Sequence, residues 1–150
     1  MELVRLGDEL NGVLVRVLGR FGAGALQFHD HLAAEVVVAT EFVSGKLDLV
    51  LAPADLQDWE HALDALAVGG GVRWLDGGRS PEIQLSGRES GSLVRVTVVD
   101  EPASGVSVTL ELSVADGWID DHRARLRAVR EAWPSEVVEA SPGVYEWRCP

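Results

Sequence analysis

The sequence predicts an α+β protein in which an antiparallel, hairpin-built sheet carries two packed helices. Several segments, such as 105–114, alternate apolar and polar residues with the period of a strand. Only two segments, 53–68 and 117–133, repeat apolar residues at three- and four-residue steps. Short turn sequences join most strands, without the regular strand–helix alternation of parallel sheets. The chain has 150 residues and no internal repeat or linker, so we expect a single domain over 1–150.

The first two predicted strands form a hairpin. Residues 12–19 alternate Val13, Val15 and Val17 with Leu14, Arg16 and Leu18. A short strand at residues 3–6 precedes them, and the Gly, Asp and Asn residues between the two segments favour a turn. We therefore expect these strands to pair directly.

A second hairpin follows. Its first strand covers residues 32–43, which are rich in β-branched residues, and its second covers 46–52. Ser44 and Gly45 are expected to make the turn between them.

Residues 53–68 form the first predicted helix. Asp55 can cap its first turn, and the glycines at 69–71 end it. The apolar stripe, which we expect to face the core, comprises Leu56, Trp59, Leu63 and Leu66. The residues expected to face water are Asp58, Glu60, His61 and Asp64.

The remaining chain predicts a strand-rich half, a helix and a tail. The strands cover 72–75, 82–87, 92–100 and 105–114. A helix over 117–133 places Ile119, Leu126, Val129 and Trp133 inward, and Pro134 stops it. Residues 144–147 could add an edge strand that pairs with a second copy of the chain, so the oligomeric state stays open.

Composition narrows the classes of function. The net charge is -11, from 13 Lys plus Arg against 24 Asp plus Glu, which disfavours nucleic acids and anionic membranes as partners. Such a negative charge would speed association with a basic partner, but it is also explained by the need to keep the protein soluble. Cys149 is the only cysteine, so no intramolecular disulfide forms. No apolar run is long enough to span a membrane and the first residues do not resemble a signal peptide, so we expect a cytoplasmic protein.

The candidate catalytic and metal-binding patterns are incomplete. His29 and His31 would lie on one side of an extended segment, but a zinc site needs at least three protein ligands. Asp120 and Asp121 lie beside His122 in sequence and could shift the pKa of its imidazole for acid–base catalysis. The simpler interpretation is structural, because acids at a helix N-terminus are stabilised by the helix dipole. The glycines match neither a dinucleotide fingerprint nor a phosphate loop. We expect no catalytic residue, no metal and no cofactor.

The strongest candidate for a function is a protein-binding surface. A solvated face is the simpler reading of the first helix's acids, but they could also meet a basic partner. Trp74 beside a glycine loop is a candidate exposed anchor, whereas Trp59 and Trp133 are predicted in the core. Four arginines in 122–130 could hold phosphate or pair with acids. The candidate partner-binding residues are Asp55, Asp58, Glu60, Asp64, Trp74, Asp76 and Arg79.

Residues 29–85 resemble a family of small uncharacterised actinobacterial proteins. The shared features are an F-V-S-G turn at 42–45, a D-L-x-D-W helix start at 55–59 and a W-L-x-D-G-R-S-P segment at 74–81. Gly77 stands where the family pattern has Asp. The resemblance extends over most of the chain and implies a layout without an established activity.

The order of hairpins, a D-L-x-x-W helix and a strand-rich half is also similar to that of WapI-type immunity proteins. This resemblance implies a non-enzymatic inhibitor that neutralises a toxin by binding it. An acidic inhibitor covering a cationic toxin site would account for the net charge. The alternatives are a small-molecule-binding or regulatory domain with a pocket near Trp74 and Arg79, and thirdly an undetected enzyme or metal-binding protein.

Overall fold

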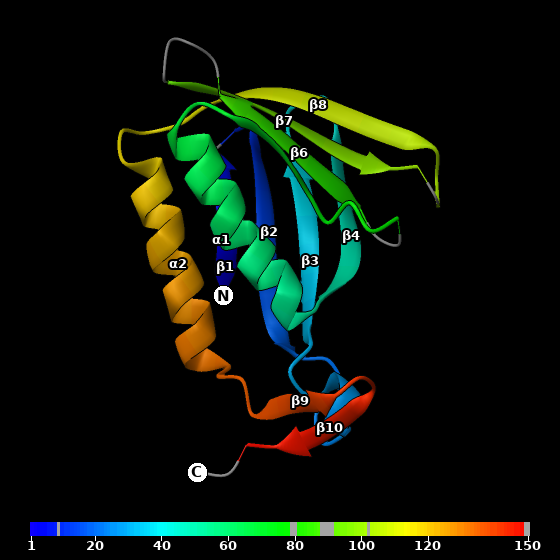
Figure 1. Ribbon diagram of the computed structural model, residues 1–150. Helices are drawn as coiled ribbons and strands as arrows, with labels where there is room; N and C mark the ends of the chain where they lie inside the picture. The colour runs from blue at the N-terminus through cyan, green and yellow to red at the C-terminus, as the bar shows by residue number, and fades with distance from the viewer. Residues whose placement is uncertain (9, 79–80, 88–91, 102, 149–150) are drawn as a thin grey trace.

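The computed structural model describes residues 1–8, 10–78, 81–87, 92–101 and 103–148, and it confirms the α+β class (Figure 1). The first four strands form one antiparallel sheet in the order β1-β2-β3-β4. The next four form a second antiparallel sheet in the order β5-β6-β7-β8, and β9 pairs with β10 separately. The helices α1 and α2 lie next to each other against this framework. Arg79, Glu89 and Cys149 lie outside the described residues.

The bounds of most elements are close to those predicted, but β3 ends earlier and η1 and β9 were not predicted. The first sheet contains β1 (Glu2–Gly7), β2 (Gly12–Arg20), β3 (Leu32–Ala39) and β4 (Ser44–Leu51). The second contains β5 (Gly71–Trp74), β6 (Glu82–Gly87), β7 (Leu93–Asp100) and β8 (Val106–Ser113). The other elements are α1 (Pro53–Ala67), α2 (Trp118–Ala132), β9 (Val137–Ser141), β10 (Val144–Trp147) and a short 3-10 helix, η1 (Leu26–Phe28).

The first eight strands divide into two four-stranded sheets, whereas the sequence predicted one sheet. The helix α1 connects β4 to β5, and β5 pairs with β6 in the second sheet rather than with β4 in the first. This arrangement leaves β4 at an edge of the first sheet, with β3 as its only strand partner among the described residues.

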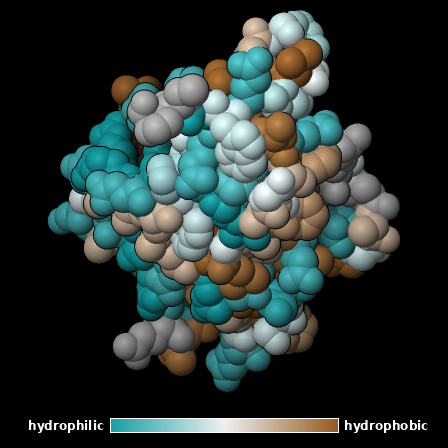
Figure 2. All heavy atoms as spheres, turned by 90° about the horizontal axis from the view of Figure 1, so that it is seen from below, coloured by the Kyte–Doolittle hydropathy of each residue, from teal (hydrophilic) through white to brown (hydrophobic). Residues whose placement is uncertain are grey.

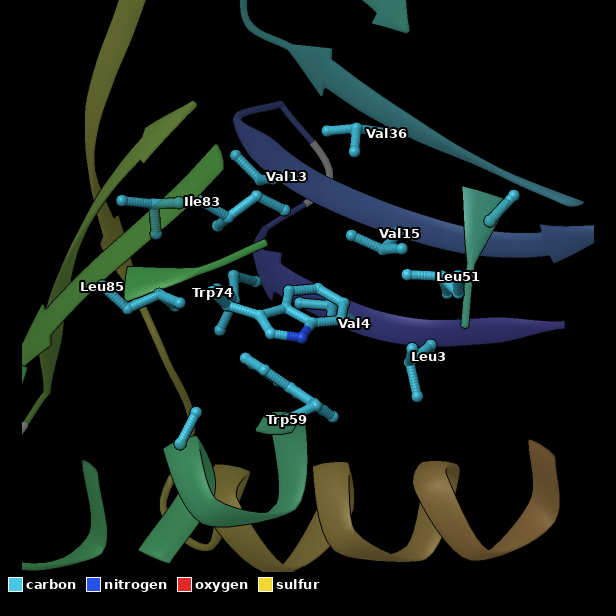
Figure 3. Close-up of a cluster of buried hydrophobic side chains, with 14 of the residues drawn as sticks. Leu3, Val4, Val13, Val15, Val36, Leu51, Trp59, Trp74, Ile83 and Leu85 are labelled. Atoms are coloured by element: carbon cyan, nitrogen blue, oxygen red, sulfur yellow. The ribbon is translucent and has the colours of Figure 1, made fainter. Parts of the chain in front are cut away.

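The core lies between the two sheets and is closed by the helices (Figure 3). Val13 of β2 faces Ile83 of β6 across the space between the sheets, whereas Val15 lies on the side of Leu51 of β4. Trp59 of α1 and Trp74 of β5 lie among these side chains with ring centroids 4.7 Å apart. Both indoles are at most 1% exposed, so they link the helix to both sheets.

The turn between β3 and β4 comes earlier than predicted. The turn covers residues 40–43, and Ser44 and Gly45 already belong to β4. The Thr40 hydroxyl accepts hydrogen bonds from the backbone N–H groups of Phe42 at 3.2 Å and Val43 at 2.7 Å. A side-chain turn of this kind closes the hairpin without glycine, which explains why the glycine signal was misleading.

The predicted tail strand exists as β10, but it is not an edge of the main sheet. It pairs with β9, a strand that the sequence analysis did not predict, in a separate hairpin at the lower end of the molecule in Figure 1. Seen from below, this end mixes hydrophobic with hydrophilic side chains (Figure 2). Across the described residues, neither helix has the length and apolar character needed to cross a membrane.

Candidate binding cleft

A cleft of about 970 Å³ lies along β4, an edge strand of the first sheet. Four consecutive β4 residues, 47–50, line it. Successive side chains of a strand point to opposite faces, so a cavity lined by all four residues follows the strand itself and is not confined to the side chains of one face. Across the cleft lie Leu75, Gly77 and Pro81 from the β5–β6 connection, and Asp100 and Ala103 from the end of β7 and the turn after it.

Part of the cleft wall is apolar and exposed. Leu18 at the end of β2 and Phe21 just beyond it are each 57% exposed, and Phe28 of η1 is 43% exposed. All three line the cleft, as does His31, whose ring contacts Phe28 edge-on at 5.3 Å. Exposed apolar side chains that gather at one cavity mark a surface suited to a partner or ligand.

Apart from the His31 imidazole, the titratable side chains of the cleft are all acidic. Asp48, Asp55 and Asp100 line it, and none of its described lining residues is lysine or arginine. Asp48 lies opposite Glu35 in the register, but Arg16 and Lys46 bind Glu35 at 2.9 and 3.1 Å. Within the described chain, Asp48 has no ion pair of its own. The cleft therefore presents carboxylates to whatever enters it.

Asp55 enters the cleft from the first turn of α1. Its carboxylate accepts a hydrogen bond from the Ala52 N–H at 2.7 Å, as the predicted cap requires. Burial raises the pKa of Asp55, and the nearby charge of Asp58 raises it further. The hydrogen bond from Ala52 and the charge of His31 lower the pKa by less, so the net effect is an increase. This carboxylate is therefore less well solvated than an ordinary surface aspartate, and a cation in the cleft would relieve that penalty.

Trp74 is buried, so the expectation of an exposed anchor there is wrong. The indole is 1% exposed, and its Nε1 donates to the backbone carbonyl of Asp55 at 2.8 Å. Trp74 thus fixes the start of α1 against β5. The next residue, Leu75, has a φ of 62°, a left-handed conformation that is costly for leucine and directs the chain into the cleft wall.

The acids on the outer face of α1 are partly paired within the fold. Glu60 binds Arg130 of α2 at 2.9 Å, and Asp64 binds Arg123 at 2.9 Å. These two ion pairs join α2 to α1, so Arg123 and Arg130 already bind acids within the fold. Asp58 stays exposed and lines a separate hollow of about 420 Å³ with Trp74 and Asp76. The structure therefore does not gather the predicted binding residues into one surface, and it does not describe Arg79.

The residues His29 and Asp30 form a clasp for the C-terminal hairpin, a role that the sequence analysis missed. His29 accepts a bond from the Gly24 N–H at its Nδ1 and contacts Glu136 through Nε2 at 2.8 Å. The Asp30 carboxylate accepts hydrogen bonds from the Arg20 side chain, the Ser135 hydroxyl and the backbone N–H groups of Glu136 and Val137. Burial would raise the pKa of Asp30, but these hydrogen bonds outweigh burial and lower it.

Replacing Asp30 with asparagine is expected to release β9 and β10 locally. An amide offers one acceptor atom and presents an N–H₂ group to the donors, so bonds to a charged acceptor worth about 1.5–3 kcal/mol are lost. Amide hydrogen exchange of residues 137–147 should accelerate about tenfold or more. Asp48→Asn is the matched control, since it removes the same charge from a carboxylate without these partners. Unchanged exchange in the Asp30 variant would refute the clasp.

His122 is a second buried histidine and it also has a structural role. Its Nδ1 donates to the Trp118 carbonyl at 2.6 Å, and its Nε2 accepts the backbone N–H of Arg5 at 3.1 Å. Burial lowers the pKa of His122. This effect is larger than the opposing effects of the two hydrogen bonds and of the charge on Asp121, which raise the pKa. The ring is thus neutral and joins α2 to β1. Among the described residues no group of three or more His, Cys, Asp or Glu side chains is arranged to hold a metal ion.

Residues 1–134 match DUF5959, a family of unknown function. The chain belongs to the DUF5959 family. A search of curated proteins and a search of solved structures found no match. The DUF5959 match agrees with the resemblance to an uncharacterised family seen in the sequence. It covers both sheets, both helices and the cleft, and it ends before the hairpin β9–β10 that the Asp30 clasp holds.

Proposed function

We propose that this protein is a non-enzymatic binding protein, an immunity-like inhibitor whose acidic surface receives a basic protein. The single observation that carries this proposal is the cleft beside β4, with apolar walls, three carboxylates and no lysine or arginine among its described lining residues. Apolar surface supplies the favourable free energy of association, and complementary charge selects and steers the partner. The resemblance of the layout to WapI-type immunity proteins supports the inhibitory role.

The distribution of ion pairs favours the cleft over the outer face of α1 as the binding surface. On α1, Glu60 and Asp64 already have arginine partners, so a basic partner would have to compete with them. In the cleft, Asp48 has no such competitor in the described chain, and Asp55 is partly desolvated before any partner arrives. Partly buried carboxylates interact more strongly with an incoming cation than fully solvated ones.

The second candidate is a small amphipathic cation. The cleft volume of about 970 Å³ lies within the range of small-molecule sites, and His31 and Asp55 could orient a ligand there. This ligand would need the same apolar and anionic features as a basic protein segment.

A selection from a random peptide library tests the proposal. The protein is immobilised, and peptides displayed on phage are selected at low salt. We expect the selected peptides to be enriched in Lys and Arg together with apolar residues. The double variant Asp48→Lys/Asp100→Lys should lose about tenfold or more in affinity for them, and moderate salt should weaken the wild-type interaction.

The matched control is Asp116→Lys/Glu131→Lys, which changes the net charge equally at two exposed residues, one just before α2 and one in its last turn. It should retain binding if the cleft is the site. Absence of selected peptides, enrichment of acidic peptides, or equal loss in both double variants would overturn the proposal. Binding of polyamines but of no peptide would favour the small cation instead.

A further inference from the structure

We infer that the partner binds by strand addition: an extended segment with alternating apolar and basic residues pairs with the free edge of β4. This inference rests on the proposed function and names the binding mode at the same cleft. It follows from the position of β4 at the end of its sheet, from the shape of the cleft, and from the chemistry of its two sides.

The edge of β4 offers unused backbone hydrogen-bonding groups. In the first sheet β4 pairs with β3 over its whole length, from Leu51 opposite Leu32 to Ser44 opposite Ala39. The described residues include no strand on its other side. Every second residue of an edge strand turns its N–H and C=O groups away from its one neighbour, which makes the edge a template for an added strand.

The cleft lies where an added strand would lie. It is lined by the consecutive residues 47–50, so it follows β4 along its length and is not confined to the side chains of one face. The opposite wall comes from the β5–β6 connection and from the turn after β7, which leaves the edge accessible between them. A peptide seated there would form main-chain bonds with β4 and place alternate side chains on the two faces, as in other cases of β-strand addition.

The two faces of β4 differ in chemistry and so predict the pattern of the partner. Leu47 and Leu49 lie on the core side, and Leu49 is 5% exposed. Asp48 and Val50 lie on the other side, where Asp48 has no ion pair in the described chain. Cross-strand neighbours stabilise a sheet when apolar meets apolar and opposite charges meet. The added strand should therefore place apolar residues beside Leu47 and Leu49, and Lys or Arg beside Asp48.

A second copy of the chain fits this edge less well than a basic segment. Two β4 edges would bring together two clefts that each carry three carboxylates, in a protein with a net charge of -11. Like charges at close range oppose association. The partner is accordingly a segment of a different, basic protein.

The experiment uses the full-length protein and the octapeptide acetyl-(Val-Lys)₄-amide as the probe. Affinity is measured by titration, and amide hydrogen exchange is followed residue by residue by NMR with and without saturating peptide. We expect alternate amides within 44–51 to exchange at least about tenfold more slowly in the complex, because they gain hydrogen bonds to the peptide. The intervening amides, already bonded to β3, should change much less.

The same molecule provides the control edges. The strands β5 and β8 are the outer strands of the second sheet, and their amides should not gain protection from the peptide. The peptide acetyl-(Val-Glu)₄-amide, with the same apolar residues and the opposite charge, should bind at least about tenfold more weakly.

The outcomes separate strand addition from the proposed function. Binding of the Val-Lys peptide that is lost in Asp48→Lys/Asp100→Lys, but without new protection in β4, would overturn strand addition and leave the basic partner standing. Absence of binding, or equal binding of the Val-Glu peptide, would overturn both. New protection at β8 instead of β4, or a free protein that is already a dimer with β4 protected, would also overturn strand addition.

Discussion

Replacing Trp59 with alanine is expected to lower the free energy of unfolding by about 3–5 kcal/mol, the range for truncating a buried tryptophan. The indole is fully buried between α1 and the sheets, and it contacts both Trp74 and the ring of His122. Its removal would leave a cavity at the junction of three elements. Urea denaturation at pH 7.5, followed by circular dichroism, measures the change.

A phenylalanine at the same position should be far better tolerated, with a loss of about 1–2 kcal/mol. The Trp59 Nε1 has no hydrogen-bond partner in the described part of the chain. Replacement by phenylalanine therefore removes a buried N–H donor without breaking a hydrogen bond. Trp74→Phe is the matched comparison, because Trp74 donates to the Asp55 carbonyl and loses that bond. If Trp59→Phe cost as much as Trp59→Ala, the hydrogen-bond argument would be wrong.

The second large effect is a loss of stability in mild acid caused by His122. Burial holds the folded-state pKa of this imidazole below its ordinary value of 6.5. The unfolded chain therefore binds a proton more readily than the folded chain, and stability falls as the pH drops from about 6.5 through the folded-state pKa. Each unit by which folding lowers the pKa corresponds to about 1.4 kcal/mol.

The variant His122→Gln isolates this contribution, because glutamine does not titrate. It should cost about 1–3 kcal/mol at pH 7.5, since at least one of the bonds to Arg5 and Trp118 is weakened. Between pH 6.5 and 5 the stability of the wild type should decline more steeply than that of the variant. His61→Gln, at an exposed position on α1, serves as the control and should follow the wild type. Parallel pH profiles for wild type and His122→Gln would contradict the assignment.

The sequence predicted the elements that depend on local periodicity. Both helices and most strands were expected within a few residues, because burial of one face imposes a period of 3.6 or 2 on the apolar residues. The division into two sheets could not be predicted, since hairpin periodicity shows which neighbours pair and says nothing of where a sheet ends. The strand β9 was missed because four of its five residues are exposed and carry no burial pattern.

The candidate cleft was predicted only in part. Asp55 was named from its place at a helix start, and it does line the cleft. Asp48 and Asp100 could not be joined to it from sequence, because they come from different sheets and meet only through the packing of the two halves. Trp74 was misjudged because the glycines that follow it suggested an exposed loop, whereas its indole is buried and bonds to the first turn of α1.

The clasp at Asp30 has a consequence for the evolution of the family. Three of the four donors to this carboxylate, the Ser135 hydroxyl and the N–H groups of Glu136 and Val137, lie beyond residue 134, where the family match ends. A relative without this hairpin would keep Arg20 as the sole partner of a nearly buried acid. A family member that lacks this hairpin is therefore expected to lack an acid at the position of residue 30 as well.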